Sequence, residues 1–428
     1  MQRKTAAAAH FSRGEQFRTA GRWEEAIECY GRAAAAAPDF VEAHCNRGNA
    51  LLQLQRWEAA LACFDAALRI DPELAMLHAN RAVVLKELGR FEESLESFDR
   101  AIARRPGYAT AIFNRATLLL SMGDYVRGFA DYEWRWEDTL GSVYKEKRAF
   151  SQPRWQGVEP IDGRTILLYG EQGLGDALQF CRYVPLVAQL GARVILEVHA
   201  PLLTLLADLP GVSQVLSRGS PLPGFDFQAP LMSMAHAFKS TPDSIPQAHR
   251  YLTSDPGKQA EWERKLGPAR PRIGLAWSGN PAHAGDARRS IALERLLEAL
   301  PVGFRYVSLQ KVVRDPDLAA LRSRPDLAHF GDELHDFSDT AALCECMDVV
   351  VSVDTSVAHL AAALGKPTWI LLSSVPDWRW LLGRDDSPWY RSVTLQRRRP
   401  GQSWDPVLQR LAGDLREAYP AAGIDRRV

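Results

Sequence analysis

The sequence predicts an α-helical repeat array followed by two α/β domains. Three observations support this fold class. Aromatic residues recur at a fixed interval in the first third of the chain, short apolar runs alternate with helical stretches after residue 161, and Gly and Pro cluster between residues 253 and 271. With 428 residues, of which 46% are hydrophobic and 24% charged, the chain has the composition of a globular protein with more than one domain.

The repeat is read from Trp23, Trp57, Phe91 and Tyr125, which follow one another at intervals of 34 residues. The same interval separates three prolines and three Asn-Arg pairs: Pro38, Pro72 and Pro106, and Asn46-Arg47, Asn80-Arg81 and Asn114-Arg115. A 34-residue period is typical of a helix–turn–helix solenoid. The pattern resembles the tetratricopeptide repeat over residues 6–141, in about four units, and the resemblance implies a concave groove that binds a peptide or protein segment.

Asn46, Asn80 and Asn114 are the candidate groove residues. A polar residue repeated on the first helix of each unit either hydrogen-bonds a bound peptide or stabilises the array itself. Residues 142–160 are predicted to be a linker between the array and the first α/β lobe.

Two α/β lobes are predicted after the linker, at residues 161–252 and 268–418. In the first, apolar runs at 165–169, 193–198, 214–217 and 226–229 indicate strands, and residues 178–190 read as a crossover helix. In the second, the runs lie at 272–277, 306–309, 349–353, 368–372 and 393–395. Strands that alternate with helices predict parallel sheets, and two such lobes are expected to face one another across a cleft.

Residues 349–367 contain the sharpest local pattern, a strand, a helix start, a helix and a stop. Asp354 or Thr355 is expected to cap the helix, and Gly365 suits its left-handed C-terminal position. The helix start would offer free N–H groups to a diphosphate without a metal, although a plain strand–helix connection has the same pattern.

This segment resembles the D-[ST]-x-x-x-H-L-A-A-A-x-G-x-P stretch of heptosyltransferase-like family 9 glycosyltransferases, which have the GT-B fold of two Rossmann-type domains. The resemblance implies a nucleotide-sugar site at Asp354, Thr355, Ser356 and His359. Ser356 departs from the family, which commonly has Gly there. His359 either contacts the donor or satisfies the core.

The loop at 170–178 also resembles the family, whose first strand leads to a Gly-Asp pair at a helix start. In that family the Asp is the proposed general base, so the resemblance makes Asp176 the candidate base, with Glu171 in reserve. The alternative is that Asp176 only caps the helix. Neither the dinucleotide fingerprint nor the P-loop lysine is present.

A third candidate segment follows the strand at 272–277. Ser278, Gly279 and Asn280 are expected to contact the donor, and Arg289 would replace the lysine with which family members neutralise the leaving diphosphate. The aromatic loop at 373–390 either stacks on a nucleobase or packs against the final helix at 404–415, and we expect packing for most of its rings. In GT-B proteins that helix often crosses back to the first lobe.

Charge and cysteine usage restrict the partners. Lys plus Arg and Asp plus Glu both number 52, which disfavours nucleic acid or anionic lipid as partner. The six cysteines are scattered, and we expect no metal and no cofactor beyond the nucleotide-sugar co-substrate. No signal peptide and no run of 18 apolar residues is found, so we expect no transmembrane segment and a cytoplasmic location.

The leading hypothesis is an inverting, metal-independent glycosyltransferase that moves a sugar from a nucleotide donor to a hydroxyl on a protein recruited by the repeats. One alternative is transfer to a glycan or lipopolysaccharide. The other is an inactive scaffold that binds nucleotide sugar.

Overall fold

The computed structural model describes residues 2–139, 141, 143–246, 249–283 and 285–420. The chain divides into two compact units, residues 1–145 and 146–428, and each is described by itself. The division falls at the start of the segment predicted to be a linker, so residues 146–160 belong to the second unit.

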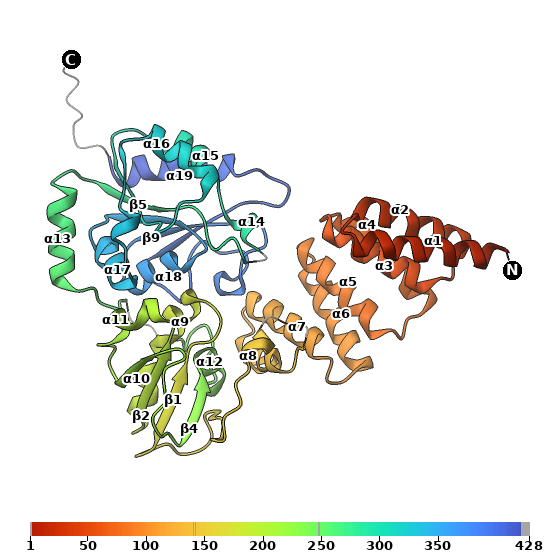
Figure 1. Cartoon of the computed structure of the whole chain (residues 1–428), viewed down its shortest axis with the longest axis horizontal. Helices are drawn as coiled ribbons and strands as arrows, with labels where there is room; N and C mark the ends of the chain where they lie inside the picture. Colours follow the sequence, from red (N-terminus) through yellow and green to blue (C-terminus); the bar gives the residue numbers. More distant parts are fainter. Residues whose placement is uncertain (1, 140, 142, 247–248, 284, 421–428) are drawn as a thin grey trace. The chain divides into compact units, whose positions relative to one another are not determined.

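The first unit is a stack of antiparallel helix pairs (Figure 1). The pairs are α1 (Gln2–Thr19) with α2 (Trp23–Ala36), α3 (Val41–Gln53) with α4 (Trp57–Ile70), α5 (Ala75–Glu87) with α6 (Phe91–Arg104), and α7 (Ala109–Ser121) with α8 (Tyr125–Tyr132). Each periodic aromatic is the first residue of the second helix of its pair. The predicted helical repeat array is therefore confirmed.

Small and aromatic residues fill the interior of the array. Ala60, Phe64 and Ala67 of α4 are fully buried, and Gly48 of α3 lies directly against the Phe64 ring. The repeated arginines connect neighbouring units. Arg115 donates to Asp131 at 2.8 Å and to Asp99 at 2.6 Å, so one guanidinium joins two successive second helices.

The first sheet of the second unit contains four parallel strands in the order β3-β2-β1-β4. Their bounds are β1 (Thr165–Tyr169), β2 (Arg193–Val198), β3 (Val212–Ser217) and β4 (Phe227–Pro230). The short helices of this lobe are α9 (Leu174–Phe180), α10 (Val184–Gln189), α11 (Leu203–Leu206) and α12 (Met234–Ala237). The order reverses between β1 and β4, which places the loop after β1 at a topological switch point.

The second sheet contains six parallel strands in the order β10-β9-β8-β5-β6-β7. They are β5 (Arg272–Ala276), β6 (Arg305–Ser308), β7 (Leu327–His329), β8 (Val349–Val353), β9 (Thr368–Leu372) and β10 (Val393–Arg397). The sequence analysis missed β7, because three residues are too few to give a periodic signal. The switch point of this sheet lies between β5 and β8.

Helices cover both faces of the second sheet (Figure 1). The helices of this lobe are α13 (Pro256–Leu266), α14 (Asp286–Arg289), α15 (Leu293–Ala299), α16 (Leu318–Ser323), α17 (Phe337–Glu345), α18 (Ser356–Ala363) and α19 (Asp405–Ala418). Leu408 and Leu411 of α19 share one hydrophobic core with Leu296 of α15 and Val351 of β8. The final helix therefore packs within its own lobe, and the expectation that it crosses back to the first lobe is wrong.

The crossover helix predicted at 178–190 is interrupted. A 3-10 turn, η3 (Cys181–Tyr183), separates α9 from α10, and Pro185 stands in the first turn of α10. Because proline has no N–H to continue the preceding helix, the chain changes direction here. The Gly- and Pro-rich segment at 253–271, where the first predicted lobe ends and the second begins, contains helix α13.

The aromatic loop of the second lobe packs against the first lobe, not against α19. Its 3-10 turn is η8 (Trp378–Trp380). The Phe180 ring lies 5.5 Å from that of Trp389 and 6.4 Å from that of Trp378. Packing of these rings was expected, but the partner is α9, a helix more than 190 positions earlier in the chain.

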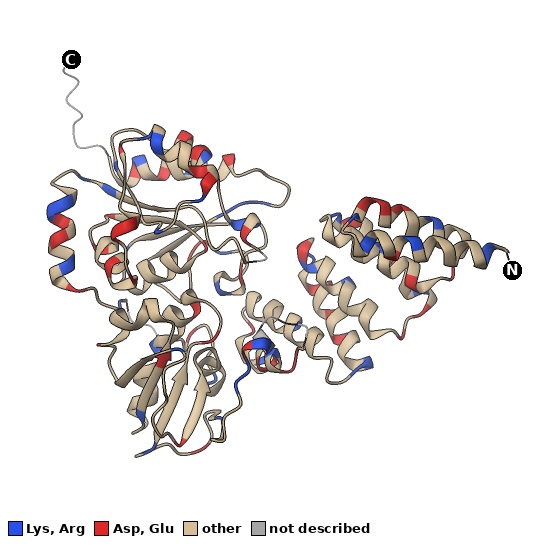
Figure 2. Cartoon of the chain, in the orientation of Figure 1, with Lys and Arg blue, Asp and Glu red and all other residues tan. Residues whose placement is uncertain are grey.

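Charged residues gather on the helices, while the central strands β1, β8 and β9 contain none (Figure 2). Such strands are covered on both faces, as parallel strands usually are. Among the described residues, no helix is long and apolar enough to cross a membrane.

The contact of Gly48 with Phe64 gives a stability prediction. A Cβ at residue 48 would lie 2.7 Å from the buried ring, so Gly48→Ala is expected to lower the free energy of unfolding by about 1–3 kcal/mol. Gly31→Ala is the matched control, because its Cβ would meet only Arg47 at 3.6 Å and alanine favours helix by about 1 kcal/mol. Thermal unfolding followed by circular dichroism measures both, and equal stability of the two variants would contradict this packing.

Candidate functional site

A cavity of about 490 Å³ lies at the carboxyl edge of the second sheet, beside the switch point between β5 and β8. It is lined by the loops that follow β5 and β6, by the first turns of α17 and α18, and by two residues of the first lobe, Leu174 and Pro201. Crevices at a switch point are where parallel α/β sheets bind ligands. Its volume is in the range of pockets that hold small organic molecules.

The polar wall of the cavity has more positive than negative charge. Lys311 and Arg314 line it from the loop after β6, and Asp336 is its one acidic lining residue in the described chain. Asp336 accepts hydrogen bonds from the Ser338 N–H at 2.7 Å and from the Ser338 hydroxyl at 2.6 Å as the cap of α17. The negative charge of Asp336 is thus used in capping α17. The remaining charge of the wall is positive, which favours an anionic ligand.

The N-terminus of α18 opens into the same cavity. Thr355 is its N-cap residue, but its side chain accepts no capping hydrogen bond, contrary to the expected cap. Thr355, Ser356 and Val357 line the cavity. The first N–H groups of a helix have no intrahelical acceptor, so this end of α18 offers donors and a positive dipole to an anion. Gly365 has the predicted left-handed backbone at the other end, with φ of 73°.

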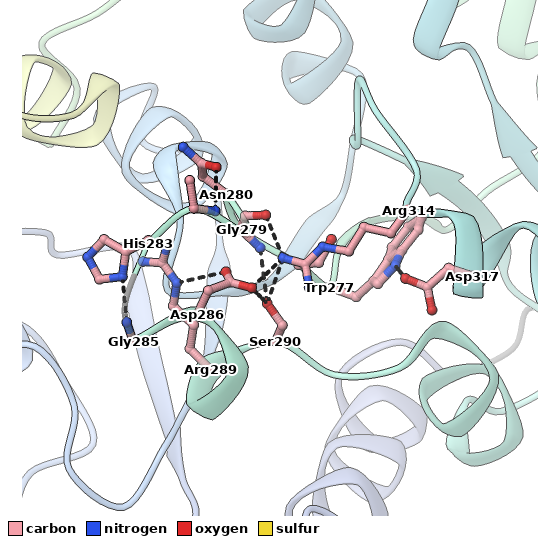
Figure 3. A network of polar contacts seen from close by, with 12 residues as sticks. Trp277, Gly279, Asn280, His283, Gly285, Asp286, Arg289, Ser290, Arg314 and Asp317 are labelled. Carbon is pink, nitrogen blue, oxygen red and sulfur yellow. Dashed lines mark hydrogen bonds and ion pairs between the residues drawn. The ribbon is translucent and has the colours of Figure 1, made fainter. Parts of the chain in front are cut away.

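A network centred on buried Asp286 holds the loop after β5 in place (Figure 3). The Asp286 carboxylate accepts hydrogen bonds from Arg314 at 2.5 Å and from the Ser290 hydroxyl at 3.1 Å, and Arg289 lies 3.4 Å away. Arg314 also donates to the Gly279 carbonyl at 2.7 Å. The loop is therefore shaped before any ligand binds.

Two of the predicted donor residues lie behind the cavity wall. Asp354 follows β8, and its carboxylate is 3.9 Å from Nε2 of buried His359. Nδ1 of His359 is 2.9 Å from the Tyr390 hydroxyl, and its ring stacks on Trp380 at 5.3 Å. Burial lowers the pKa of His359 to about 3, so the ring is neutral. Burial, with the charge of Asp377, raises the pKa of Asp354 to about 6.

The candidate base Asp176 lies at the start of α9. It accepts a hydrogen bond from the Gly173 N–H at 2.7 Å, and its other oxygen pairs with Arg379 of the second lobe. Burial raises the pKa of Asp176, and Arg379 opposes that rise. Asp176 therefore caps α9, and this capping does not exclude a role as general base. Glu171, the reserve candidate, is 2% exposed.

The structure separates the predicted donor residues into two groups. Those that line the cavity are Ser278, Gly279, Asn280, Thr355 and Ser356. Arg289, Asp354 and His359 support the wall from behind it. The sequence analysis missed Gln310, Lys311, Arg314, His335 and Thr340. Of these, Gln310 and Lys311 directly follow a predicted strand, and the strand-end rule could have found them.

The predicted groove asparagines serve the array in two of three cases. The Asn46 amide donates to Glu15 at 2.8 Å and the Asn80 amide to Asn49 at 3.0 Å, each in the preceding repeat. The corresponding neighbour of Asn114 is Val83, which cannot accept. Among the described residues, no group of three or more His, Cys, Asp or Glu side chains is arranged to bind a metal ion.

Comparison with known families identifies both parts of the chain. Residues 11–75 and 80–133 match the tetratricopeptide repeat, and residues 335–379 match glycosyltransferase family 9 (heptosyltransferase). The second match runs from the start of α17 to Arg379 and includes the α18 segment. The chain therefore combines a region similar to tetratricopeptide repeats with a segment similar to glycosyltransferase family 9.

Protein FlbA of Caulobacter vibrioides is 28% identical over 320 residues, which are 68% of this chain. The chain spans about half the length of FlbA, 52%. Among solved structures, MamA is 20% identical with a TM-score of 0.30, covering 32% of this chain and 76% of MamA. The second TPR domain of human RPAP3, in complex with an HSP70 peptide, is 26% identical with a TM-score of 0.26, covering 27% of this chain and 95% of the domain.

The neutral His359 predicts an acid-sensitive fold. Its folded-state pKa lies below the unfolded value near 6.5, so its contribution is complete above pH 6.5 and is lost as the pH falls toward 3, by up to about 4 kcal/mol. His359→Asn, which keeps an amide near Tyr390, is expected to be less stable at pH 7.5 but to lose less stability between pH 7.5 and 5. Thermal unfolding across this range measures the effect, with His249→Asn as exposed control. Parallel curves for wild type and His359→Asn would refute it.

Proposed function

We propose that this protein is a glycosyltransferase that moves a sugar from a nucleotide-sugar donor in the cavity to an acceptor hydroxyl, on a protein recruited by the repeats. The observation that carries the proposal is the shared location of three features. The cavity, the free N-terminus of α18 and the family 9 match all meet at residues 335–357.

The charges support a diphosphate ligand. The diphosphate would lie at the α18 start, beside Ser356 and Asn280, with Lys311 supplying positive charge. Negative charge grows on the leaving diphosphate in the transition state, and a fixed helix end and lysine stabilise it without reorganisation. Arg289 was the expected cation, but Arg289 and Arg314 both pair with Asp286, which favours Lys311 for this role.

The proposed reaction is a single displacement in a GT-B arrangement. The acceptor hydroxyl oxygen bonds to the anomeric carbon while the bond from that carbon to the diphosphate oxygen breaks, and the diphosphate leaves with the electron pair. Asp176 takes the hydroxyl proton, and attack from the face opposite the diphosphate inverts the configuration. Leu174, which lines the cavity, stands two residues before Asp176, so the base is near the donor.

The proposal includes a cytoplasmic location, because all six cysteines are free and buried and free thiols suit a reducing compartment.

Ligand-induced stabilisation tests donor binding. UDP, GDP, ADP, TDP and their sugar conjugates are screened by thermal shift, and a ligand of the folded state raises the apparent stability. We expect one class of nucleotide to raise the melting temperature and the others to leave it unchanged. Lys311→Ala should weaken that ligand about tenfold, since a charge-assisted hydrogen bond contributes roughly 1.5–3 kcal/mol, whereas exposed Lys239→Ala should not. No shift with any nucleotide or nucleotide sugar in folded protein would refute the proposal.

Two variants test catalysis and acceptor choice. Asp176→Asn should retain the thermal shift but lower transfer by about 100-fold or more, in the range of general-base catalysis, and undiminished transfer would remove Asp176 from this role. Deletion of residues 1–141 should abolish transfer to protein while the donor-induced thermal shift persists. Unchanged transfer by the deletion variant would instead indicate a glycan acceptor.

A further inference from the structure

Two buried arginines cross the boundary between the lobes of the second unit in opposite directions. Arg182 of the first lobe donates to the Trp389 carbonyl of the second at 2.6 Å and to the Tyr251 hydroxyl at 2.9 Å. Arg379 of the second lobe extends to α9 of the first. Both side chains are at least 93% buried. Arg379 contacts the candidate base Asp176, whereas Arg182 contacts Trp389 and Tyr251, so Arg182 serves as a control for Arg379.

Arg379 distributes its guanidinium over three acceptors. Nε donates to the Gln179 amide oxygen, one terminal nitrogen to Asp377 at 2.8 Å, and the other to Asp176. Its charged plane also lies over the Trp378 ring at 4.4 Å. A planar guanidinium with this set of partners is restricted to one orientation. The Arg379 side chain therefore fixes the position of the Asp176 carboxylate relative to the second lobe.

The charges around Asp176 make Arg379 its principal counter-ion. The groups that act on the carboxylate are Arg379, Asp377 and His283 of the second lobe, and Asp176 in turn acts on His199 of the first lobe. Burial lowers the pKa of both histidines, so they supply little positive charge near neutral pH. Loss of Arg379 would leave this largely buried carboxylate beside Asp377 without its counter-ion, which favours its protonated form.

We propose that Arg379 is a positioning residue for the base, which holds Asp176 across the lobe boundary and keeps it ionised. The inference rests on the proposed function and adds to it a residue that acts through Asp176 without contacting the reacting atoms. The base is then complete only when the two lobes are docked, since its counter-ion belongs to the donor lobe.

A pH-dependent double-mutant cycle on the full chain tests the inference without requiring activity. In Arg379→Gln, the folded-state pKa of Asp176 is expected to rise further above its unfolded value, so stability should fall more steeply than in wild type as the pH rises from 5 to 8. Arg379→Gln/Asp176→Asn removes this carboxylate and should abolish the additional slope. Equal slopes for the single and double variants would overturn the inference.

Turnover gives the second readout. The acidic limb of the pH–rate profile of Arg379→Gln should shift to higher pH by at least one unit. On that shifted limb kcat falls about tenfold per pH unit below the plateau, and the donor KM should change little. Arg182→Gln, which crosses the same boundary without touching Asp176, should lose stability without moving that limb. A loss for Arg379→Gln that is the same at every pH would mean that Arg379 is only a structural link.

If Arg379→Gln does not fold, Arg379→Lys and its Asp176→Asn double variant replace it. One ammonium cannot satisfy Asp176, Asp377 and Gln179 together, so the same pH-dependent difference, of smaller size, is expected, and identical slopes overturn the inference. Absent coupling in a protein that transfers sugar refutes the inference alone. Coupling in a folded protein that binds no nucleotide refutes the proposed function and, with it, the positioning role.

Discussion

The contact between α9 of the first lobe and α18 of the second determines the geometry of the candidate site. The two helix starts meet where Gly175 faces His359, and a Cβ on residue 175 would lie 2.9 Å from the imidazole ring. A residue without a side chain therefore permits this approach. Because Asp176 follows Gly175, and Thr355 and Ser356 precede His359 by one turn, the contact brings the candidate base and the start of α18 close together.

Buried charge is the second constraint on this unit. Asp176 and Asp354 are largely buried, Asp377 is a more exposed acid beside them, and Arg289 and Arg379 are the nearby cations. Burial keeps His359 neutral. Acids that outnumber cations in a region of low dielectric raise the pKa of the least compensated carboxyl, and this is Asp354. Lys311 lies at the cavity wall away from these three acids, where it can attract an anion, whereas Arg314 is paired with Asp286.

The repeat array follows different physics. Its arginines and asparagines are mostly engaged with neighbouring repeats, as Arg115 and Asn80 show. Such contacts are repeated from unit to unit, so the stability of the array is a sum over neighbours. Asn114 departs from this pattern, because Val83 stands where Glu15 and Asn49 accept from Asn46 and Asn80.

The sequence alone determined the repeats, nine of the ten strands of the described chain and the α18 segment, because each depends on a local period or on a helix start and stop. It also indicated the family, through residues that are contiguous in the chain. Only the tertiary structure decided which side chains meet. Arg379 pairs with a carboxylate 203 positions earlier, and the residues that line the cavity come from six separate segments of the described chain. Such contacts depend on how two lobes dock, and no local pattern encodes the docking of surfaces that are distant in the chain.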